Sequence, residues 1–231
     1  MWYSILVFLC LAIGCCAQEP STFESLQSGS DPALNTDPAS TFWAAARPVY
    51  AEVDSKGNPS NEYRTEIRSR WTKENLYFLF TCPYKHLYVK TDPDTARETY
   101  GLWKWNVAEV FIGSDFNDIK RYKEFEVSPQ NEWVDLDINL NSPHHEDGWL
   151  WNSGFQHETR NDVSSHTWYV VMNIPFASLG KPVVEPGNLF RVNFYRTDGP
   201  PTDTKEVMWR PTQSSTFHVP ERFGVLKLVA H

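Results

Sequence analysis

Short apolar segments with a period of two recur along this chain, and they constrain its fold more than any other feature. Successive side chains of a strand point to opposite faces, so an alternating run marks a strand with one buried face. The segment EYRTEIRSRW alternates Tyr63, Thr65 and Ile67, and LYFLFTC returns after the turn-forming TKEN. This predicts a hairpin whose second strand is buried on both faces. Six further runs predict strands: VAEVFIG, YKEFEVS, EWVDLDIN, HTWYVVMNI, LFRVNFYR and FGVLKLV.

The segments between these runs are rich in turn-forming residues, as in NSPHHEDG and TDGPPTD. Candidate helices are few and short, limited to STFWAAA and PFASLG. Many short strands with this punctuation are typical of β-sandwiches. We therefore expect an all-β fold, an antiparallel β-sandwich of about eight to ten strands, built as a single domain.

The N-terminal segment, residues 1–17, has the pattern of a signal peptide. The apolar run Ile5–Ile13 is too short to span a bilayer, and Cys15 and Ala17 suit the small-residue positions of a signal-peptidase site. Alternatively, the run that ends at Cys15 resembles a lipoprotein cleavage box. We therefore expect a secreted or periplasmic protein, or one with a lipid anchor to the cell surface at Cys15.

Composition bounds the remainder of the chain. Residues 18–38 are rich in Ser, Pro, Asp and Gln and predict a flexible lead-in, followed by one domain over residues 39–231. The net charge of −8, with no run of Lys or Arg, argues against nucleic acid as a partner. Cys82 is the one cysteine beyond the leader, so no internal disulfide is expected, and its place in an apolar run predicts a buried thiol.

The stretch LWKWNVAEVFIGSD places one carboxylate, Glu109, inside an apolar strand directly after two tryptophans. Strand alternation puts Glu109 on the face opposite Ala108 and Val110, and puts Asn193 on the face opposite the apolar residues of its own strand. Both polar side chains are therefore free to lie on a ligand-binding face. The alternative is a structural ion pair between Glu109 and Arg191 or Arg196.

Four segments together resemble the family 9 carbohydrate-binding modules, specifically the family-9-like proteins of bacterial secretomes: LWKWNVAEVFIGSD, YKEFEVSPQNEWVDLDI, FRVNFYR and FHVPERFGVLKL. The resemblance spans about Trp43 to Leu228. It implies a β-sandwich that grips the end of a plant-type sugar chain, such as xylan or cellulose, between two aromatic rings in support of polysaccharide catabolism. It also implies structural calcium, although the sequence shows no compact ligand loop.

The resemblance assigns roles to individual residues. Trp103, six residues before Glu109, matches the first aromatic clamp, and Glu109 matches the acid that accepts hydrogen bonds from sugar hydroxyls. Asn193 matches a polar ligand position, and Phe217 stands where the family has its second clamp, a tryptophan. Asn106 departs from the family, whose members often have Asp there. The remaining carbohydrate-binding candidates are Trp105, Tyr195, Arg196 and Trp209.

Three other functions are alternatives to carbohydrate binding, one of them a purely structural or adhesion role at the cell surface. A glycoside hydrolase needs two carboxylates flanking the scissile bond, but Glu124, Glu126, Asp135 and Asp137 alternate with apolar residues as solvent-facing side chains do. The segment HHED, residues 144–147, is likewise expected to be a solvated loop rather than a metal site. A haem-binding electron-transfer sandwich would use Met172 or Met208 with His166 or His218. We therefore expect a non-catalytic monomer that binds an oligo- or polysaccharide, with a separate glycoside hydrolase as a further partner.

Overall fold

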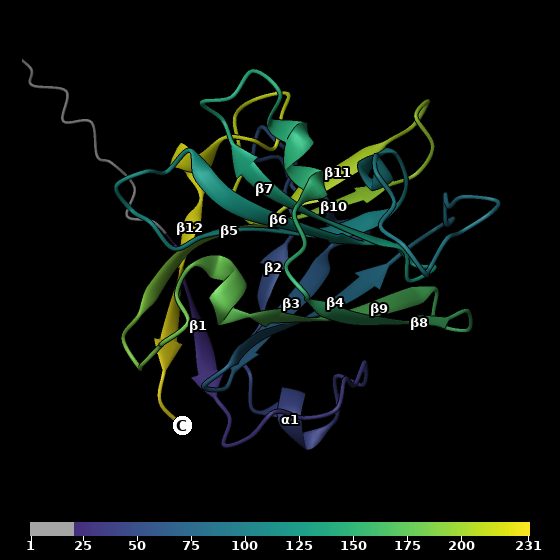
Figure 1. Ribbon diagram of the computed structural model, residues 1–231. Helices are drawn as coiled ribbons and strands as arrows, with labels where there is room; N and C mark the ends of the chain where they lie inside the picture. The colour runs from purple at the N-terminus through teal and green to yellow at the C-terminus, as the bar shows by residue number, and fades with distance from the viewer. Residues whose placement is uncertain (1–20) are drawn as a thin grey trace, which may run out of the picture.

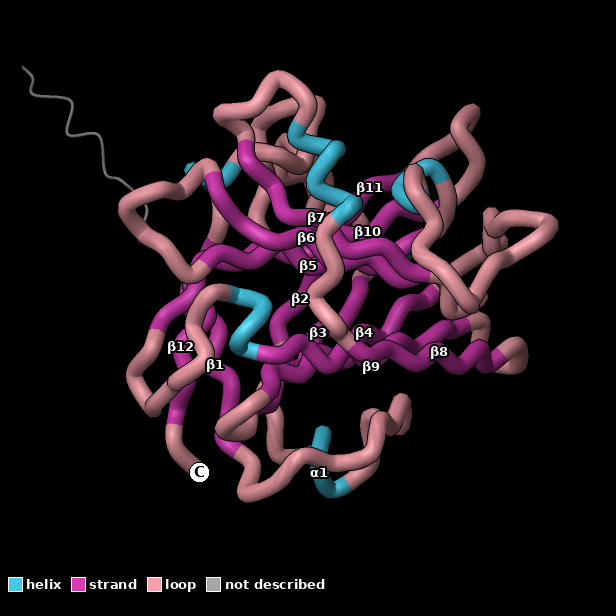
Figure 2. Tube along the Cα trace, in the orientation of Figure 1, coloured by secondary structure: helices cyan, strands magenta, loops and turns pink. Residues whose placement is uncertain are grey.

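The computed structural model describes residues 21–231, so the expected signal peptide and Cys15 lie outside the described residues. Twelve strands form one mixed sheet that curls over on itself into two packed leaves (Figures 1 and 2). The β-sandwich is therefore confirmed. The strand number exceeds the eight to ten predicted, and the sheet is mixed rather than wholly antiparallel, because β1 pairs in parallel with both of its neighbours.

The two leaves have similar numbers of strands. The upper leaf in Figure 1 contains β5 (Val107–Gly113), β6 (Arg121–Val127), β7 (Trp133–Asn139), β10 (Leu189–Asp198) and β11 (Lys205–Met208). The lower leaf contains β2 (Val49–Ala51), β3 (Thr65–Trp71), β4 (Asn75–Pro83), β8 (Gln156–Asp162) and β9 (Thr167–Pro175). Between them in the sheet run β12 (Gly224–Val229) and β1 (Thr22–Gln27). The order is β7-β6-β5-β10-β12-β1-β3-β4-β9-β8, with β11 on β10 and β2 on β3.

The helices are short and lie in the connections between strands. They are α1 (Thr41–Ala44) and the 3₁₀ turns η1 (Asn61–Tyr63), η2 (Leu102–Lys104), η3 (His145–Leu150), η4 (Phe176–Leu179) and η5 (Pro220–Arg222). Both segments with predicted helical character contain one, since α1 falls in STFWAAA and η4 in PFASLG. Over residues 21–231, no helix has the length and apolar character needed to cross a membrane.

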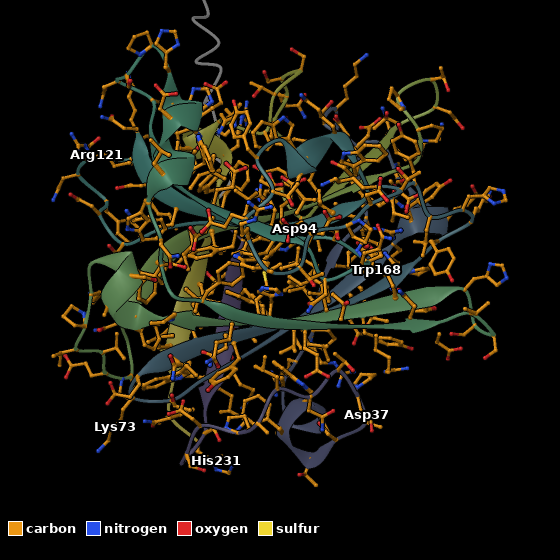
Figure 3. The ribbon with its side chains drawn as sticks, turned by 45° about the vertical axis from the view of Figure 1, so that its right-hand side comes forward. Asp37, Lys73, Asp94, Arg121, Trp168 and His231 are labelled. Atoms are coloured by element: carbon orange, nitrogen blue, oxygen red, sulfur yellow. The ribbon has the colours of Figure 1, made fainter. Side chains whose placement is uncertain are left out.

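Large apolar side chains from both leaves fill the space between them (Figure 3, where Trp168 of β9 is labelled). The rings of Phe78 and Phe80 on β4 meet Phe194 of β10 at centroid distances of 5.2 and 5.9 Å. The opposite face of β4 is also covered, because its residues pack with Trp43 of α1 in a separate cluster. This double burial explains why the β4 sequence is apolar at almost every position. Cys82, near the end of β4, is fully buried, and burial raises the pKa of its thiol to about 12. The thiol is therefore protonated and acts as a packing side chain.

The expected flexible lead-in is wrong for its described part, because residues 22–27 form β1. This strand lies between β12 and β3 and joins the two leaves. Phe23 is buried against Phe194, and the Ser25 hydroxyl pairs with that of Ser69. Farther along, the Asp31 carboxylate accepts hydrogen bonds from Thr72, Asn75 and Tyr77 of the lower leaf. The polar composition of residues 18–38 gave no sign of this strand. The strand is stabilised by backbone pairing and one large apolar side chain, so it lacks an alternating apolar pattern.

Candidate functional site

A cleft of about 470 Å³ opens on the outer face of the upper leaf. Its floor is formed by side chains from β5, β6, β7 and β10, including Glu109, Phe111, Glu124 and Thr197. Four connections form its walls: η2 with Trp103 and Lys104, η3 with His145 and Glu146, the β10–β11 loop with Pro201 and Thr204, and the segment before η5 with Phe217 and His218. These residues come from distant parts of the chain, and only the pairing of β5 with β6 and β10 brings them together.

The Phe217 wall of the cleft is fixed in position by residues of β10. Its ring stacks on Tyr195 at a centroid distance of 4.3 Å and an interplanar angle of 8°. The Tyr195 hydroxyl donates a hydrogen bond of 3.0 Å to the Phe217 carbonyl oxygen, and Asn193 Nδ2 donates to that hydroxyl at 2.8 Å. The Asn193 side chain is itself fixed by two hydrogen bonds with the Arg210 backbone: its Nδ2 donates to the carbonyl oxygen, and its Oδ1 accepts from the amide N–H. Asn193 and Tyr195 therefore support the aromatic wall rather than line the cleft.

Trp103 occupies a different wall and is also braced by other rings. Tyr100 meets it edge-on at a centroid distance of 5.2 Å, and Tyr100 in turn contacts Trp149 at 5.3 Å. The Trp103 side chain remains partly exposed at the cleft. An aromatic ring held at a fixed angle loses little conformational freedom when it stacks on a flat ligand. The cleft therefore presents two supported aromatic rings, Trp103 and Phe217.

Three buried carboxylates, which we call the acidic trio, gather at the cleft floor and directly beneath it: Glu109 and Glu124, which line the cleft, and Glu126, which does not. Glu109 of β5 lies directly opposite Glu126 of β6, and Glu124 lies two residues before Glu126 on the same face. One carboxylate oxygen from each residue lies within 4.8 Å of the others. All three side chains are at most 4% exposed. Like charges opposed across a strand pair repel, so this arrangement is costly unless something compensates it.

The environment of the acidic trio favours the protonated carboxyl. Burial raises the pKa values of Glu109 and Glu126 well above that of an ordinary glutamate, and neighbouring carboxylates raise both pKa values further. Burial likewise raises the pKa of Glu124 to about 7. At the cleft wall, burial lowers the pKa of His218 to about 4, so this imidazole is neutral near pH 7. Its Nδ1 forms a hydrogen bond with the Tyr122 hydroxyl at 2.6 Å.

The structural ion pair considered for Glu109 does not form. Arg196 pairs with Asp198, and the Arg191 guanidinium donates to the carbonyl oxygens of Ile119 and Pro220. Glu109 instead accepts one hydrogen bond of 3.2 Å from the Thr197 hydroxyl. Among residues 21–231, no Lys, Arg or His forms an ion pair with any member of the acidic trio. Within the described residues, the acidic trio therefore has no cationic side chain as a partner.

Of the eight predicted ligand residues, the structure brings Trp103, Glu109 and Phe217 into the cleft, and the other five do not line it. Asn193 and Tyr195 support the Phe217 wall, and the remaining three pack elsewhere. Trp105 stacks on Tyr88 at a centroid distance of 4.6 Å. Arg196 follows Tyr195 on β10 and therefore points into the space between the leaves. Trp209 packs there too, against Phe23 and Phe194. Their side chains are used for packing and a buried ion pair, and they do not line this cleft.

Sequence reasoning missed several residues in and beneath the cleft. It predicts that Glu124 and Glu126 face solvent, yet both are buried on the outer face of β6, and Glu124 lines the cleft. His145 and Glu146, expected in a solvated loop, form part of the cleft wall, and the His145 ring lies 4.5 Å from that of His218. The shared face of Glu109 and Glu126 was detectable only with the β5–β6 register known.

Gly148→Ala should test how closely η3 must approach the sheet. A Cβ at Gly148 would lie 2.8 Å from the carbonyl carbon of Asp137 on β7, and nearer still to its oxygen. Because these are backbone atoms, η3 must move, and with it His145 and Glu146. We expect a loss of about 1–3 kcal/mol in urea unfolding. Gly29→Ala is the matched control, since no atom lies within 4 Å of its Cβ. Equal stability of the two variants would contradict this account.

Comparison with known proteins agrees with this architecture. The sequence profile of the carbohydrate family 9 binding domain-like family matches residues 38–231. The chain belongs to this family. A protein of Arthroderma benhamiae named "Extracellular protein" is 27% identical over 178 residues, which span 72% of this chain and 79% of that protein.

Solved family 9 modules share the fold at low identity. One from Caldicellulosiruptor kristjanssonii, in complex with cellotriose, gives a TM-score of 0.66 at 12% identity and covers 91% of this chain and 95% of its own. Its complex with glucose gives 0.64 at 12% identity, with coverages of 90% and 96%. A candidate carbohydrate-binding protein from Bacteroides uniformis gives 0.70 at 14% identity, covering 91% of this chain and all of its own. The family 9 fold thus extends over nearly the whole described chain.

Proposed function

We propose that this protein binds carbohydrate without catalysis, holding the end of a plant-type oligo- or polysaccharide in the cleft between Trp103 and Phe217. The observation that carries the proposal is the combination of two braced aromatic rings with a carboxylate floor in one cleft. A pyranose presents C–H faces, which stack on aromatic rings, and hydroxyl edges, which donate hydrogen bonds to carboxylates. Membership of a family of carbohydrate-binding domains supports the same function.

The ligand class is inferred from the cleft and from relatives. Family 9 modules of similar fold have been solved with cellotriose and glucose, so β-linked gluco-oligosaccharides are the first candidates, followed by xylo-oligosaccharides. A volume of about 470 Å³ accommodates one or two sugar units, which favours a chain end over an internal segment. The leader pattern and the relative named "Extracellular protein" support a secreted location, where such polymers are degraded by separate hydrolases.

Calorimetric titration of the purified protein with glucose, cellotriose and xylotriose tests the proposal. We expect one binding site per chain, and affinity that increases from the monosaccharide to the trisaccharide. The absence of binding across a broad glycan array would overturn it. Incubation with cello- and xylo-oligosaccharides should release no reducing sugar, because Glu109 and Glu124 lie together on the cleft floor and Glu126 does not line the cleft, so no two of them flank a bound sugar from opposite sides. Release of sugar would favour the hydrolase alternative.

A further inference from the structure

The oxygens of the acidic trio are buried with few hydrogen-bond partners. Glu126 is fully buried, and neither of its carboxylate oxygens has a partner among residues 21–231. Glu124 Oε2 is also buried without a hydrogen-bond partner among these residues, whereas Glu109 accepts a single hydrogen bond from the Thr197 hydroxyl. Buried polar groups of folded proteins are almost always satisfied. Unpartnered oxygens that converge on one point therefore indicate a partner from outside the chain.

We infer that Glu109, Glu124 and Glu126 bind one divalent cation of the size of Ca²⁺ at the floor of the cleft. One oxygen from each carboxylate lies within 4.8 Å of the others. Oxygen ligands lie about 2.3–2.6 Å from Ca²⁺, so ligands on opposite sides of the ion are about 5 Å apart. The donor set contains oxygen alone, which suits a hard cation rather than zinc or copper.

The charges around the acidic trio also favour a cation. Glu146 and Glu206 line the same cleft, and each adds to the repulsion within the acidic trio. The opposing side chains contribute little positive charge, since His218 is neutral near pH 7 and Lys104 is the one Lys or Arg among the cleft-lining residues. A divalent ion would neutralise most of the trio and relieve this repulsion.

A metal ion fits better than the ammonium group of an amino sugar. Glu109 and Glu124 line the cleft, but Glu126 does not. An amine attached to a sugar ring could contact the first two carboxylates without reaching the third. A partly dehydrated metal ion is small enough to bind all three carboxylates, with Glu126 as its deepest ligand.

This position gives the ion a second role, which rests on the proposed function. Ca²⁺ takes six to eight oxygen ligands, more than the acidic trio supplies if each carboxylate gives one oxygen. The remaining positions face the cleft, where Trp103 and Phe217 would hold a sugar ring. Two neighbouring hydroxyls of that sugar, together with one or more water molecules, can complete the coordination, so saccharide binding is expected to depend on the cation.

Metal titration of the purified, EDTA-treated protein tests the site without any glycan. We expect CaCl₂ to bind at one ion per chain by calorimetry, to raise the melting temperature by several degrees, and to bind more tightly than MgCl₂. Tb³⁺ in place of Ca²⁺ should luminesce on tryptophan excitation, because Trp103 lines the same cleft. Glu126→Gln, which keeps the side-chain shape, should weaken Ca²⁺ binding about tenfold or more. Glu158→Gln, at an exposed carboxylate on β8 of the other leaf, is the matched control.

The outcomes separate this inference from the proposed function. Absence of Ca²⁺ binding, or equal affinity in Glu126→Gln and wild type, overturns the cation site, as does a melting-temperature rise with glucosamine but not with CaCl₂. If glycan binds equally with Ca²⁺ and with EDTA, the coordination of sugar hydroxyls is wrong while carbohydrate binding stands. If Ca²⁺ binds but no glycan does, the cation site stands and the proposed function fails. Circular dichroism of each variant confirms that it is folded.

Discussion

Asp198→Ala is expected to lower the free energy of unfolding by about 3–5 kcal/mol, because it leaves a buried arginine without its counter-charge. The Arg196 guanidinium and the Asp198 carboxylate form an ion pair between the leaves, with side-chain exposures of 0% and 3%. Arg196 lies near the rings of Trp168 and Tyr63, so no water replaces a lost partner. Asp198 also accepts a hydrogen bond from Asn106, which fixes the chain that leads into β5. Urea unfolding at neutral pH measures the loss.

The double variant Arg196→Met/Asp198→Leu is the control for the buried ion pair. Removing both charges and keeping apolar volume should restore much of the lost stability, since a buried pair gains little over well-packed apolar side chains. Glycan affinity should be unchanged in the double variant, because neither residue lines the cleft. A loss below about 1 kcal/mol for Asp198→Ala would show that the pair contributes no more than a surface ion pair.

Trp103→Ala should weaken binding of the preferred oligosaccharide by about 5- to 150-fold. Stacking of a flat ligand on an aromatic ring contributes about 1–3 kcal/mol, and each 1.4 kcal/mol is a tenfold change in affinity. Because Trp103 is partly exposed and supplied by a short 3₁₀ turn, its removal should cost the fold little. Calorimetric titration of wild type and variant with the same ligand measures the ratio.

Trp105→Ala is the matched control for Trp103, since it removes the same side chain two residues away. Trp105 stacks on Tyr88 and does not line the cleft. Its loss should lower the melting temperature while leaving glycan affinity near that of wild type. An equal loss of affinity in both variants, or a larger one for Trp105→Ala, would place the ligand elsewhere than in this cleft.

The strands that alternation predicted are those with one or two apolar faces. All eight are present, as β3, β4, β5, β6, β7, β9, β10 and β12. The four that were missed lack this signal. β8, QHETRND, is an edge strand without an apolar face, and β11 and β2 have four and three residues. β1 is largely polar and gains its place from parallel pairing, which involves strands distant in sequence.

The candidate site was likewise predictable only in part from the sequence. The family resemblance, which matched Trp103 by its spacing from Glu109, indicated one wall of the cleft, and the alternation within β5 indicated part of its floor. Alternation along β6 gave Glu124 and Glu126 a common face but did not show what covers that face. Burial there depends on η3 and on the segment before η5, whose positions follow from long-range packing.

The sequence alone determined the β-sandwich class, the aromatic–acid strand that begins the site, and membership of the family 9 carbohydrate-binding domains. These are local properties, since alternation and spacing are written within a few neighbouring residues. The tertiary structure decided that Glu126 lies opposite Glu109, that Tyr195 braces Phe217, and that Arg196 points into the core. Each of these depends on the register between strands and on the connections that cover them, and residues far apart in the chain set both.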